Sequence, residues 1–343
     1  MNCKGKLLTA LLLSAAPAPA LLAGTTYTWT GVFDTTWSDA RNWNPNTGYP
    51  GYNSATDDVA MIPGVQNDRY PIVNIGDQTP LVVKSVTLQV VNGHYPTLTL
   101  PEPAQGSSGR SLYITDGASV SLDAGTTVWL DTGCDLTLGG DGYLTTIRLE
   151  GDIVFKDVGT GGGEGSPGIR LAPKDDNSSA VFVTYGSGRI RGEISGEITP
   201  GSIPGNNPPD PSRIVLVLGE GNAIYGSIES NVLLVNNGVV DPYEPVTGTP
   251  GRTLTLWCEP KGGSGLWSVT GGASGSGNEN TMIIRSNLTG TGDILIGEYG
   301  KLIVKRNVSV LGTFEMREHA DILIDKDVLF EAHRFIQVCS YSP

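Results

Sequence analysis

The sequence predicts an all-β fold, and more closely a single parallel β-helix (a solenoid), from two repeat lengths. A unit of eight residues recurs four times between Leu112 and Tyr143. A longer period of 20 to 22 residues is present near the C-terminus. A short unit nested in a period of that length is typical of a solenoid, in which each coil is built from several sides.

The eight-residue units read as very short strands separated by corners. In each unit the first and third residues are apolar, and the residue between them points to the opposite face because side chains alternate along a strand. The sixth place of the first three units holds Gly117, Gly125 and Gly133, where a corner is easiest for a residue without a Cβ. We therefore expect strands that each bury one narrow apolar face. The apolar pairs are Leu112 and Ile114, Val120 and Leu122, Val128 and Leu130, and Leu136 and Leu138.

The longer period separates the β-helix from a β-sandwich. The segment LIVKRNV at 302–308 recurs as ILIDKDV at 322–328, an offset of 20 residues. Gly-Thr steps at 290–291 and 312–313 are 22 residues apart. Antiparallel hairpins in a sandwich explain the units of eight but not the longer period, whereas a coil of roughly three sides explains both. We therefore favour the β-helix over the sandwich.

Glycine and proline limit the helical content and mark the loops. The 343 residues include 47 Gly and 22 Pro, which interrupt every candidate helix. Four Gly/Pro-rich segments have no periodicity of their own, and we interpret them as loops that project from the corners of one coil. We therefore expect one elongated β-helix at residues 65–343. The loop segments are 159–168, 199–212, 241–251 and 262–280.

The first 23 residues read as a secretory signal peptide. Two lysines precede a ten-residue apolar core at 7–16, which is too short to span a bilayer, and small residues at 18–20 and 21–23 offer cleavage sites. A membrane anchor is the alternative interpretation of this stretch. We expect a secreted protein whose mature chain begins between Leu21 and Thr25, with no transmembrane segment.

Charge and cysteine content narrow the classes of partner and cofactor. Loss of Lys4 and Lys6 with the signal peptide changes the formal net charge from −13 to −15, and so acidic a chain repels the phosphates of nucleic acid. We therefore expect no nucleic-acid partner. Cys134, Cys258 and Cys339 remain, an odd number whose spacing matches no metal site, and a disulfide between any two of them stays open. We expect no cofactor and no metal.

Residues 24–64 differ from the rest of the chain and read as a Trp-rich N-terminal cap. Trp29, Trp37 and Trp43 lie within fifteen residues of one another. A solenoid needs caps because an uncovered strand edge invites aggregation, so these rings would close the open end of the first coil. Sugar binding is the alternative, since flat aromatic rings stack on sugar faces. The acidic pair at 57–58 would tie down the loop that leads into the first strand.

Two segments resemble a known family. LTGTGDILIGEYGKLIVKRNVSVLGTFEM at 288–316 resembles the repeat of bacterial autotransporter-type passengers, in which a Gly-rich step precedes a short strand, then a Gly and a second strand. The N-terminal WTGVFDTTWSDARNWN resembles the opening of many secreted bacterial β-helix proteins. Together the two resemblances cover about a fifth of the chain. They imply a right-handed parallel β-helix at a bacterial cell surface, commonly adhesive or scaffolding.

The segment GRIRGEISGE at 188–197 offers an enzymatic alternative. If its two isoleucines point inward, then Arg189, Arg191 and Glu193 share the outer face. Polysaccharide lyases on β-helices use an outward basic residue near carboxylates that bind calcium or the substrate's uronate, and the acidic pair at 175–176 would add negative charge. The simpler interpretation is a solvated ladder of opposite charges, which is mildly stabilising on a sheet face. We prefer the simpler interpretation and expect no catalytic centre.

The sequence thus predicts a secreted structural or adhesive protein of the bacterial cell surface. A polysaccharide lyase, or another carbohydrate-active enzyme on the same fold, is the alternative. The segment at 322–338 still reads as coil, so we expect an open strand edge that docks on another subunit and gives end-to-end dimers or filaments. A loop cap and a monomer are the alternative at this end. A surface polysaccharide is the other partner that we expect.

Overall fold

The structure is a computed structural model of the chain, and its regular elements are almost all β-strands. The helices among the described residues are two short 3₁₀ turns, Ala40–Asn42 and Pro211–Arg213. Neither has the length or the apolar character needed to cross a membrane. The expected signal peptide at 1–23 lies outside the described residues. These are 24–52, 57–75, 81–101, 110–115, 120–124, 126–130, 134–139, 144–156, 166–173, 178–201, 210–243, 251–257, 263–271 and 279–338.

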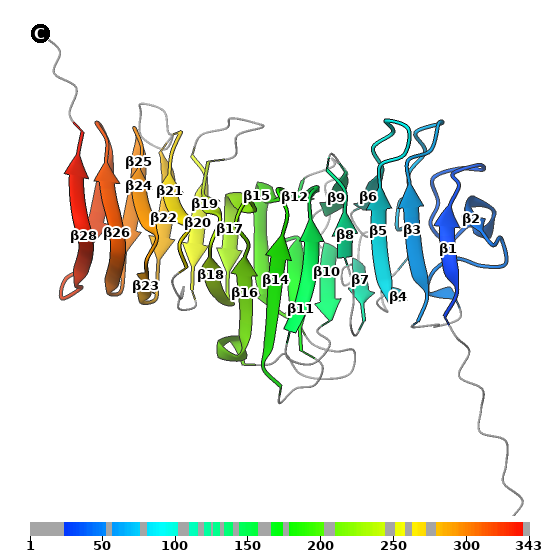
Figure 1. Cartoon of the computed structure of the whole chain (residues 1–343), viewed down its shortest axis with the longest axis horizontal. Helices are drawn as coiled ribbons and strands as arrows, with labels where there is room; N and C mark the ends of the chain where they lie inside the picture. The colour runs from blue at the N-terminus through cyan, green and yellow to red at the C-terminus, as the bar shows by residue number, and fades with distance from the viewer. Residues whose placement is uncertain are drawn as a thin grey trace, which may run out of the picture.

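Most strands belong to three parallel ladders, which place strands far apart in the sequence side by side (Figure 1). The first ladder ends on the N-terminal side with β2 (Trp43–Asn44), which pairs antiparallel to β1. Its parallel strands are β1 (Thr26–Trp29), β3 (Val59–Pro63), β5 (Ser85–Gln89), β8 (Val120–Leu122), β11 (Leu144–Leu149), β14 (Ala180–Tyr185), β16 (Ile214–Leu218) and β18 (Leu233–Asn236).

The second ladder extends from the N-terminal part of the molecule to its C-terminal end. Four of its strands are long, and each gives one half to this ladder and the other half to a neighbouring ladder. Its members are β6 (Thr97–Leu100), β9 (Thr127–Leu130), β12 (Asp152–Phe155), the first halves of β15 (Arg189–Pro200) and β17 (Ala223–Ser230), β19 (Val239–Asp241), β21 (Leu266–Val269), β24 (Asp293–Ile296), and the second halves of β26 (Val308–Met316) and β28 (Phe330–Gln337).

The remaining parallel strands form the third ladder and one shorter ladder. Near the C-terminus a shorter ladder takes the first ladder's place in the order of the chain, and it joins β23 (Leu288–Gly290) to the first halves of β26 and β28. The third ladder contains β4 (Leu81–Val83), β7 (Arg110–Ile114), β10 (Cys134–Gly139), β13 (Gly168–Ala172), the second halves of β15 and β17, β20 (Thr253–Leu256), β22 (Asn280–Ile284), β25 (Gly300–Val304) and β27 (Asp321–Ile324).

The chain visits the three ladders in turn, and this explains the units of eight. β8, β9 and β10 lie in the first, second and third ladders, and β11, β12 and β13 repeat that order. Leu112 of β7 is level with Leu136 of β10, so the register offset is 24 residues, or three units. Consecutive units are therefore successive sides and not hairpin partners. The antiparallel sandwich is wrong, because the named strands pair in parallel except at β1 and β2.

The longer period is confirmed in one of its two forms. Leu302 is level with Ile322, at the expected offset of 20. The 22-residue spacing of the Gly-Thr steps is not a register, because Gly290 is level with Val310. Register follows the inward apolar residues, and the repeated Gly-Thr letters do not stack on each other.

One corner of the coil is built from a column of glycines. Each member directly precedes a strand or half-strand of the second ladder, and an added Cβ would meet the carbonyl oxygen of the residue in the same place in the coil before it. The contact would be 2.1 Å from Gly292 to the Gly265 oxygen and 2.4 Å from Gly265 to the Gly238 oxygen. Successive coils therefore touch backbone to backbone here. We call Gly151, Gly188, Gly238, Gly265, Gly292 and Gly312 the glycine column, with Asn222 in the same place on the intervening coil.

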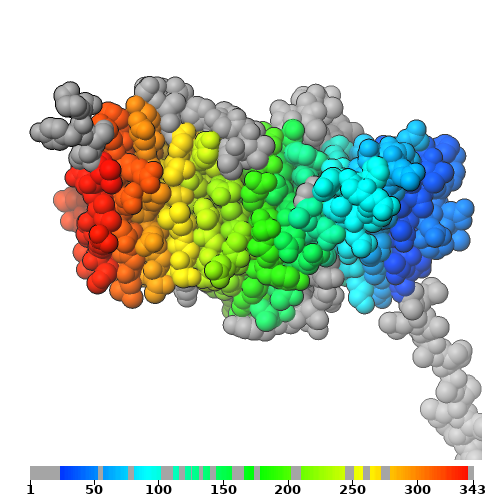
Figure 2. All heavy atoms as spheres, turned by 45° about the horizontal axis from the view of Figure 1, so that its top comes forward, coloured from blue at the N-terminus to red at the C-terminus, as the bar shows by residue number. Residues whose placement is uncertain are grey.

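The ladders surround one continuous apolar core. It extends from Tyr27 to Phe314, and the inward positions of almost every strand contribute to it. The molecule is a rod, with β1 and β2 at one end and β28 at the other (Figures 1 and 2). Because β1 and β3 already belong to the first ladder, the part of 24–64 that departs from the repeat is the segment between those two strands.

Candidate functional site

The three N-terminal tryptophans pack against one another beneath the end of the first ladder. The Trp43 ring lies between the other two, with centroids 4.9 Å from Trp29 and 4.8 Å from Trp37, both edge to face. The exposed fraction of each residue is 2% or less. In this arrangement no ring presents a face on which a sugar could stack, so the geometry favours a packing role.

The indole N–H groups of these rings also have partners. Trp29 Nε1 donates to the Arg69 carbonyl oxygen at 2.6 Å, and Trp37 Nε1 donates to the Pro50 carbonyl oxygen at 3.1 Å. Trp43 Nε1 donates to the Trp37 carbonyl oxygen at 2.7 Å. Buried tryptophans with satisfied N–H groups hold three separate backbone segments together at this end of the rod.

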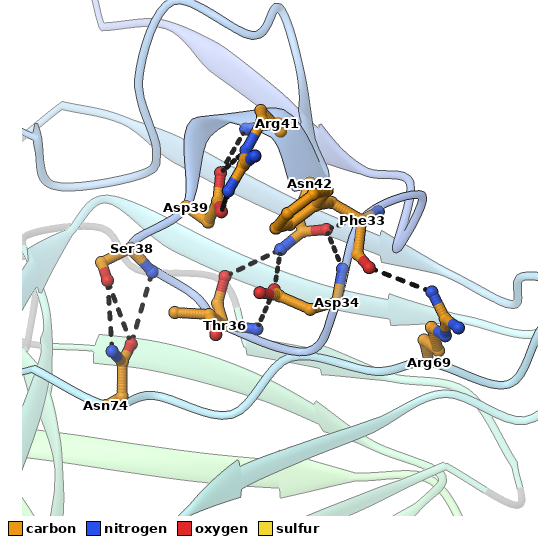
Figure 3. A network of polar contacts seen from close by, with 9 residues as sticks. All are labelled: Phe33, Asp34, Thr36, Ser38, Asp39, Arg41, Asn42, Arg69 and Asn74. Atoms are coloured by element: carbon orange, nitrogen blue, oxygen red, sulfur yellow. Dashed lines mark hydrogen bonds and ion pairs between the residues drawn. The ribbon is translucent and has the colours of Figure 1, made fainter.

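Asn42 organises the loop that carries the tryptophans (Figure 3). Its Oδ1 accepts hydrogen bonds from the backbone N–H groups of Phe33, at 3.0 Å, and Asp34, at 2.9 Å. Its Nδ2 donates to the Asp34 carboxylate and to the Thr36 carbonyl oxygen. The side chain is fully buried, so the loop conformation depends on a complete set of amide hydrogen bonds.

A surface ion pair closes the same loop. Asp39 caps the first 3₁₀ turn by accepting from the Arg41 N–H, and Arg41 Nε lies 2.9 Å from the carboxylate (Figure 3). The hydrogen bond from the Arg41 side chain holds the pKa of Asp39 below its ordinary value. The same guanidinium lies 3.2 Å above the centre of the Phe33 ring.

The acidic pair at 57–58 behaves partly as expected. Asp58 is buried, and its carboxylate accepts from the N–H groups of Thr25, at 2.9 Å, and Gly51, at 3.0 Å. It therefore ties the chain before β1 to the loop before β3, which confirms the expectation for Asp58. Because both donors are backbone groups, this contact fixes the position of the chain at both points.

The charged residues of GRIRGEISGE meet on the outer side of β15, next to β12. Arg189 makes a bidentate contact with Asp152, at 3.0 and 2.7 Å. Arg191 contacts the same carboxylate at 3.4 Å and Glu193 at 3.2 Å. Lys156 lies 3.8 Å from Glu193. The structure thus brings together the three expected residues and adds two that the sequence analysis missed; the acidic pair at 175–176 lies outside the described residues.

This cluster is built as a set of mutual ion pairs. The Arg191 side chain is only 6% exposed, and the Asp152 side chain is 13% exposed. Two carboxylates hold the Arg191 guanidinium by charge-assisted contacts, so this side chain is already committed to contacts within the protein. Lys156 also lies over the Trp129 ring, 4.5 Å from its centre. The arrangement matches a charged ladder across β9, β12 and β15.

A polar pocket of about 350 Å³ lies beside the cluster, at the corner before the second ladder. It holds two carboxylates against one guanidinium, and the Glu150 carboxylate accepts a hydrogen bond from the Ser187 hydroxyl at 3.1 Å. The Arg189 side chain is 36% exposed and is the cation of the cluster that faces this pocket. The lining residues are Thr126, Thr127, Glu150, Asp152, Ser187 and Arg189.

A second charged column crosses the third ladder. Arg170 lies 3.0 Å from Asp135 on the preceding coil and 3.7 Å from Glu197 on the following coil. Burial raises the pKa of Asp135, and Arg170 lowers it in part. Charge alternation from coil to coil is therefore a general feature of the outer faces, as cross-strand pairing favours.

Asp241 is a buried carboxylate at the end of β19. One of its oxygens accepts from the hydroxyls of Ser268 and Thr270, each at 2.6 Å, and the other accepts from the N–H groups of Tyr243 and Thr270. Burial raises the pKa of Asp241, although these hydrogen bonds oppose the effect. Asp241 therefore ties the end of β19 to the end of β21.

The raised pKa of Asp241 predicts a pH-dependent stability. Because the folded pKa lies above the unfolded value of 3.8, the folded state binds the proton more tightly, and this contribution is lost as pH rises through the folded pKa. Asp241→Asn keeps the geometry, since an amide can donate to the two hydroxyls and accept from the two N–H groups. We expect the melting temperature of the wild type to rise relative to Asp241→Asn as pH falls from 7 towards about 4.

Asp210 provides a control of opposite sign. Hydrogen bonds from the Ser212 N–H and hydroxyl lower the pKa of Asp210. The wild type should therefore lose stability relative to Asp210→Asn as pH falls towards that pKa. The melts must extend below the ordinary value of 3.8, because the contribution of Asp210 is lost only there. Equal slopes for the two variants across that wider pH range would contradict the assignment for Asp241.

Metal ligands, cysteines and similarity to known proteins assign no further site. Within the described residues no group of three or more His, Cys, Asp or Glu side chains is arranged to hold a metal ion. Of the expected cysteines, Cys134 is buried and its Sγ donates to the Pro101 carbonyl oxygen at 3.2 Å, while Cys258 and Cys339 lie outside the described part. No family model, no curated protein and no solved structure matches this chain.

Proposed function

We propose that this chain is a secreted structural or adhesive protein of a bacterial cell surface, built as a right-handed parallel β-helix. The observation that supports this best is the single apolar core, which continues from Tyr27 to Phe314 beneath three parallel ladders. Such a rod resists bending because every coil is hydrogen-bonded to the next along each side. The function is then the presentation of long outer faces, with surface polysaccharide as the partner that those faces contact.

The charged clusters support a structural role more than a catalytic one. In the charged cluster on the outer side of β15, which we call the outer-face cluster, each cation contacts a carboxylate. The cations are Arg189, Arg191 and Lys156. Ion pairs of this kind connect neighbouring coils and leave the most buried arginine out of reach of a substrate. The tryptophans, packed face to edge under β2, are proposed as the cap of the N-terminal end.

A surface location is testable on intact cells. Mild protease treatment of cells that express the chain should remove it while a cytoplasmic marker stays intact. If the chain remained protected until the cells were lysed, the proposed location would be overturned.

The enzymatic alternative keeps one specific observation in its favour, the exposed Arg189 beside the polar pocket. We expect the purified chain to produce no unsaturated uronide from acidic polysaccharides, measured by ultraviolet absorbance. Arg191→Ala should instead lower the free energy of unfolding by about 2 kcal/mol, because two carboxylates lose their charged donor. Arg306→Ala, an exposed arginine outside the cluster, should change it by less than about 0.5 kcal/mol.

The combined result separates the two functions. Uronide release that Arg191→Ala or Arg189→Ala abolishes, at a temperature where both variants stay folded, would establish the lyase. Absence of product together with the expected loss of stability would leave Arg191 as an inter-coil ion pair.

A further inference from the structure

The two ends of the rod are finished differently. At the N-terminal end β2 pairs antiparallel to β1, with Trp29 level with Trp43, and so covers the edge of the first ladder. At the C-terminal end β27 pairs with β25 and β28 pairs with β26, and within the described chain neither has a partner strand on its other side (Figure 1). An edge of this kind presents a row of backbone N–H and C=O groups to any strand that fits.

The C-terminal edge also exposes the inward side chains of the last coil. Leu302 and Phe314 are buried one coil earlier, at 0% and 7% exposure. Their level partners in the last coil are Ile322 and Phe335, and Phe335 is 59% exposed. Among the aromatic rings of the described residues, Phe335 contacts Phe314 and Phe330, at centroid distances of 5.7 and 6.2 Å. These apolar side chains are exposed at the C-terminal end of the rod, which is red in Figure 2, where a further coil would cover them.

The sequence of β28, FEAHRFIQ, is complementary to itself when it is reversed. In an antiparallel pair about a two-fold axis between Ala332 and His333, Phe330 of one chain lies opposite Phe335 of the other. Glu331 then lies opposite Arg334, and both face outward, because Glu331 and Arg334 alternate with the inward phenylalanines. Opposite charges and apolar rings are thus matched at the same time.

The backbone of β28 is oriented for this pairing. The Leu329 carbonyl accepts from Val308 N–H, so Leu329 faces β26, and the next residue, Phe330, faces the open edge. Val338 N–H donates to the Met316 carbonyl, so Val338 faces β26 and Phe335, three residues earlier, faces the open edge. Directly opposite residues that both face the edge form the hydrogen-bonded pair of an antiparallel ladder.

The third side of the coil satisfies the same two-fold axis. Asp325 N–H donates to the Val304 carbonyl, so Ile322 and Ile324 of β27 face the open edge. Ile324 is 39% exposed and lies level with Val304, which is fully buried. When β27 pairs antiparallel with its own copy, Ile322 of one chain lies opposite Ile324 of the other, and both are inward positions.

We propose that the C-terminal end binds a second copy of this chain, tail to tail, through β27 and β28. The inference deepens the proposed structural role, since it names the partner of the rod's open end. The pair is isologous and closed, so it gives a dimer of rods and not a filament. A head-to-tail filament would need the C-terminal edge to dock on an end where β2 already covers the edge of the first ladder.

The charges decide between this partner and others. Arg334 has no ion-pair partner in the described part of the chain, and the Glu331 carboxylate accepts only a 3.3 Å hydrogen bond from Ser309. In the tail-to-tail pair each Arg334 gains a Glu331 of the other chain, twice per dimer. To pair equally well, an antiparallel strand of another protein would need the same order along its own chain: an aromatic ring, an acid, a base and a second aromatic ring.

The test is analytical ultracentrifugation of the mature chain over a concentration series. We expect a monomer–dimer equilibrium that saturates at twice the monomer mass. Phe335→Glu should weaken the dimer by tenfold or more, because it places a charge in the apolar face. Glu331→Arg and Arg334→Glu should each weaken it by about tenfold, since like charges then meet at both positions. Arg306→Glu, which makes the same charge change one coil away, should have no effect.

Two further samples test whether the two copies pair antiparallel in the proposed register. The double variant Glu331→Arg with Arg334→Glu should recover dimerisation to within a few-fold of the wild type. Equal amounts of the two single variants should form a heterodimer, because each basic side chain at positions 331 and 334 of one chain then meets an acidic side chain of the other. Glu331, Arg334 and Arg306 are exposed, so unchanged circular dichroism should accompany the results for their variants. The same measurement on Phe335→Glu checks that this variant stays folded.

Three outcomes would overturn the inference. These are a monomer at all concentrations, a mass that keeps growing past the dimer, and a double variant as weak as the single ones. None of them would affect the proposed surface role, which the protease and lyase experiments test separately.

Discussion

Replacing Trp43 with alanine should lower the free energy of unfolding by about 3–5 kcal/mol, with the loss concentrated at the N-terminal end of the rod. The ring is 2% exposed and packs between Trp29 and Trp37. Its removal leaves a cavity that two fixed rings cannot fill. It also removes the indole donor to the Trp37 carbonyl oxygen, which is left buried.

Amide hydrogen exchange shows where the loss falls. Because each coil contacts mainly its neighbours, protection should fall in β1 and β3 and stay unchanged in β22 and β25. Trp257→Ala is the matched control, since that ring is 43% exposed and contacts Arg285 at 4.3 Å. It should cost about 1 kcal/mol or less. Uniform loss of protection along the rod, or equal effects of the two variants, would contradict the cap.

The faces of the strands could be predicted from the sequence, because alternation is a local property. Leu112 and Ile114 are buried at 0% and 1% exposure, and Leu136 and Leu138 at 2% and 3%. The regular units at 112–143 also contain the three-sided order, since three units of eight equal one register step. Where the corners are short and of uniform length, the repeat length in the sequence predicts the register between paired strands.

The contacts between coils could not be predicted, because loops of unequal length separate the residues that meet. Asp152 and Arg189 are 37 residues apart. The two cluster residues that the sequence analysis missed, Asp152 and Lys156, are separated from Arg189 by the segment at 159–168. An insertion of this length leaves the pairing between coils unchanged but removes the regular spacing from the sequence. The C-terminal coils, with steps near 20, have loops short enough for direct comparison.

The glycine column is a second feature that could not be predicted from a repeat length. Its members fall at intervals of 37, 34, 16, 27, 27 and 20 residues when Asn222 is counted, so no fixed spacing reveals them. Each nevertheless stands directly before a strand or half-strand of the second ladder. The useful sequence signal is therefore a glycine immediately before an alternating triplet, whatever the distance to the next one.

Gly265→Ala should destabilise the rod by about 3 kcal/mol or more, although it adds a single methyl group. The new Cβ would lie 2.4 Å from the Gly238 carbonyl oxygen and 2.7 Å from Asn236 Oδ1. The backbone cannot move away, because Leu266 N–H donates to the Gly238 carbonyl at 2.8 Å and Gly265 N–H to the Asn236 carbonyl at 2.9 Å. Relief requires that two coils separate at this corner, which breaks these hydrogen bonds and opens the core beneath Trp267.

Gly93→Ala separates crowding from backbone strain. Gly93 has φ of +79° and no atom within 4 Å of an added Cβ, so its variant bears only the conformational cost, about 1–2 kcal/mol. Urea unfolding measures both variants, and hydrogen exchange should show the Gly265→Ala loss on both sides of the β19–β21 contact. If Gly265→Ala were no more harmful than Gly93→Ala, the coils could part at the corner without cost. The glycine column would then be a sequence preference, and coil-to-coil stability would rest on the ladders and the inward side chains alone.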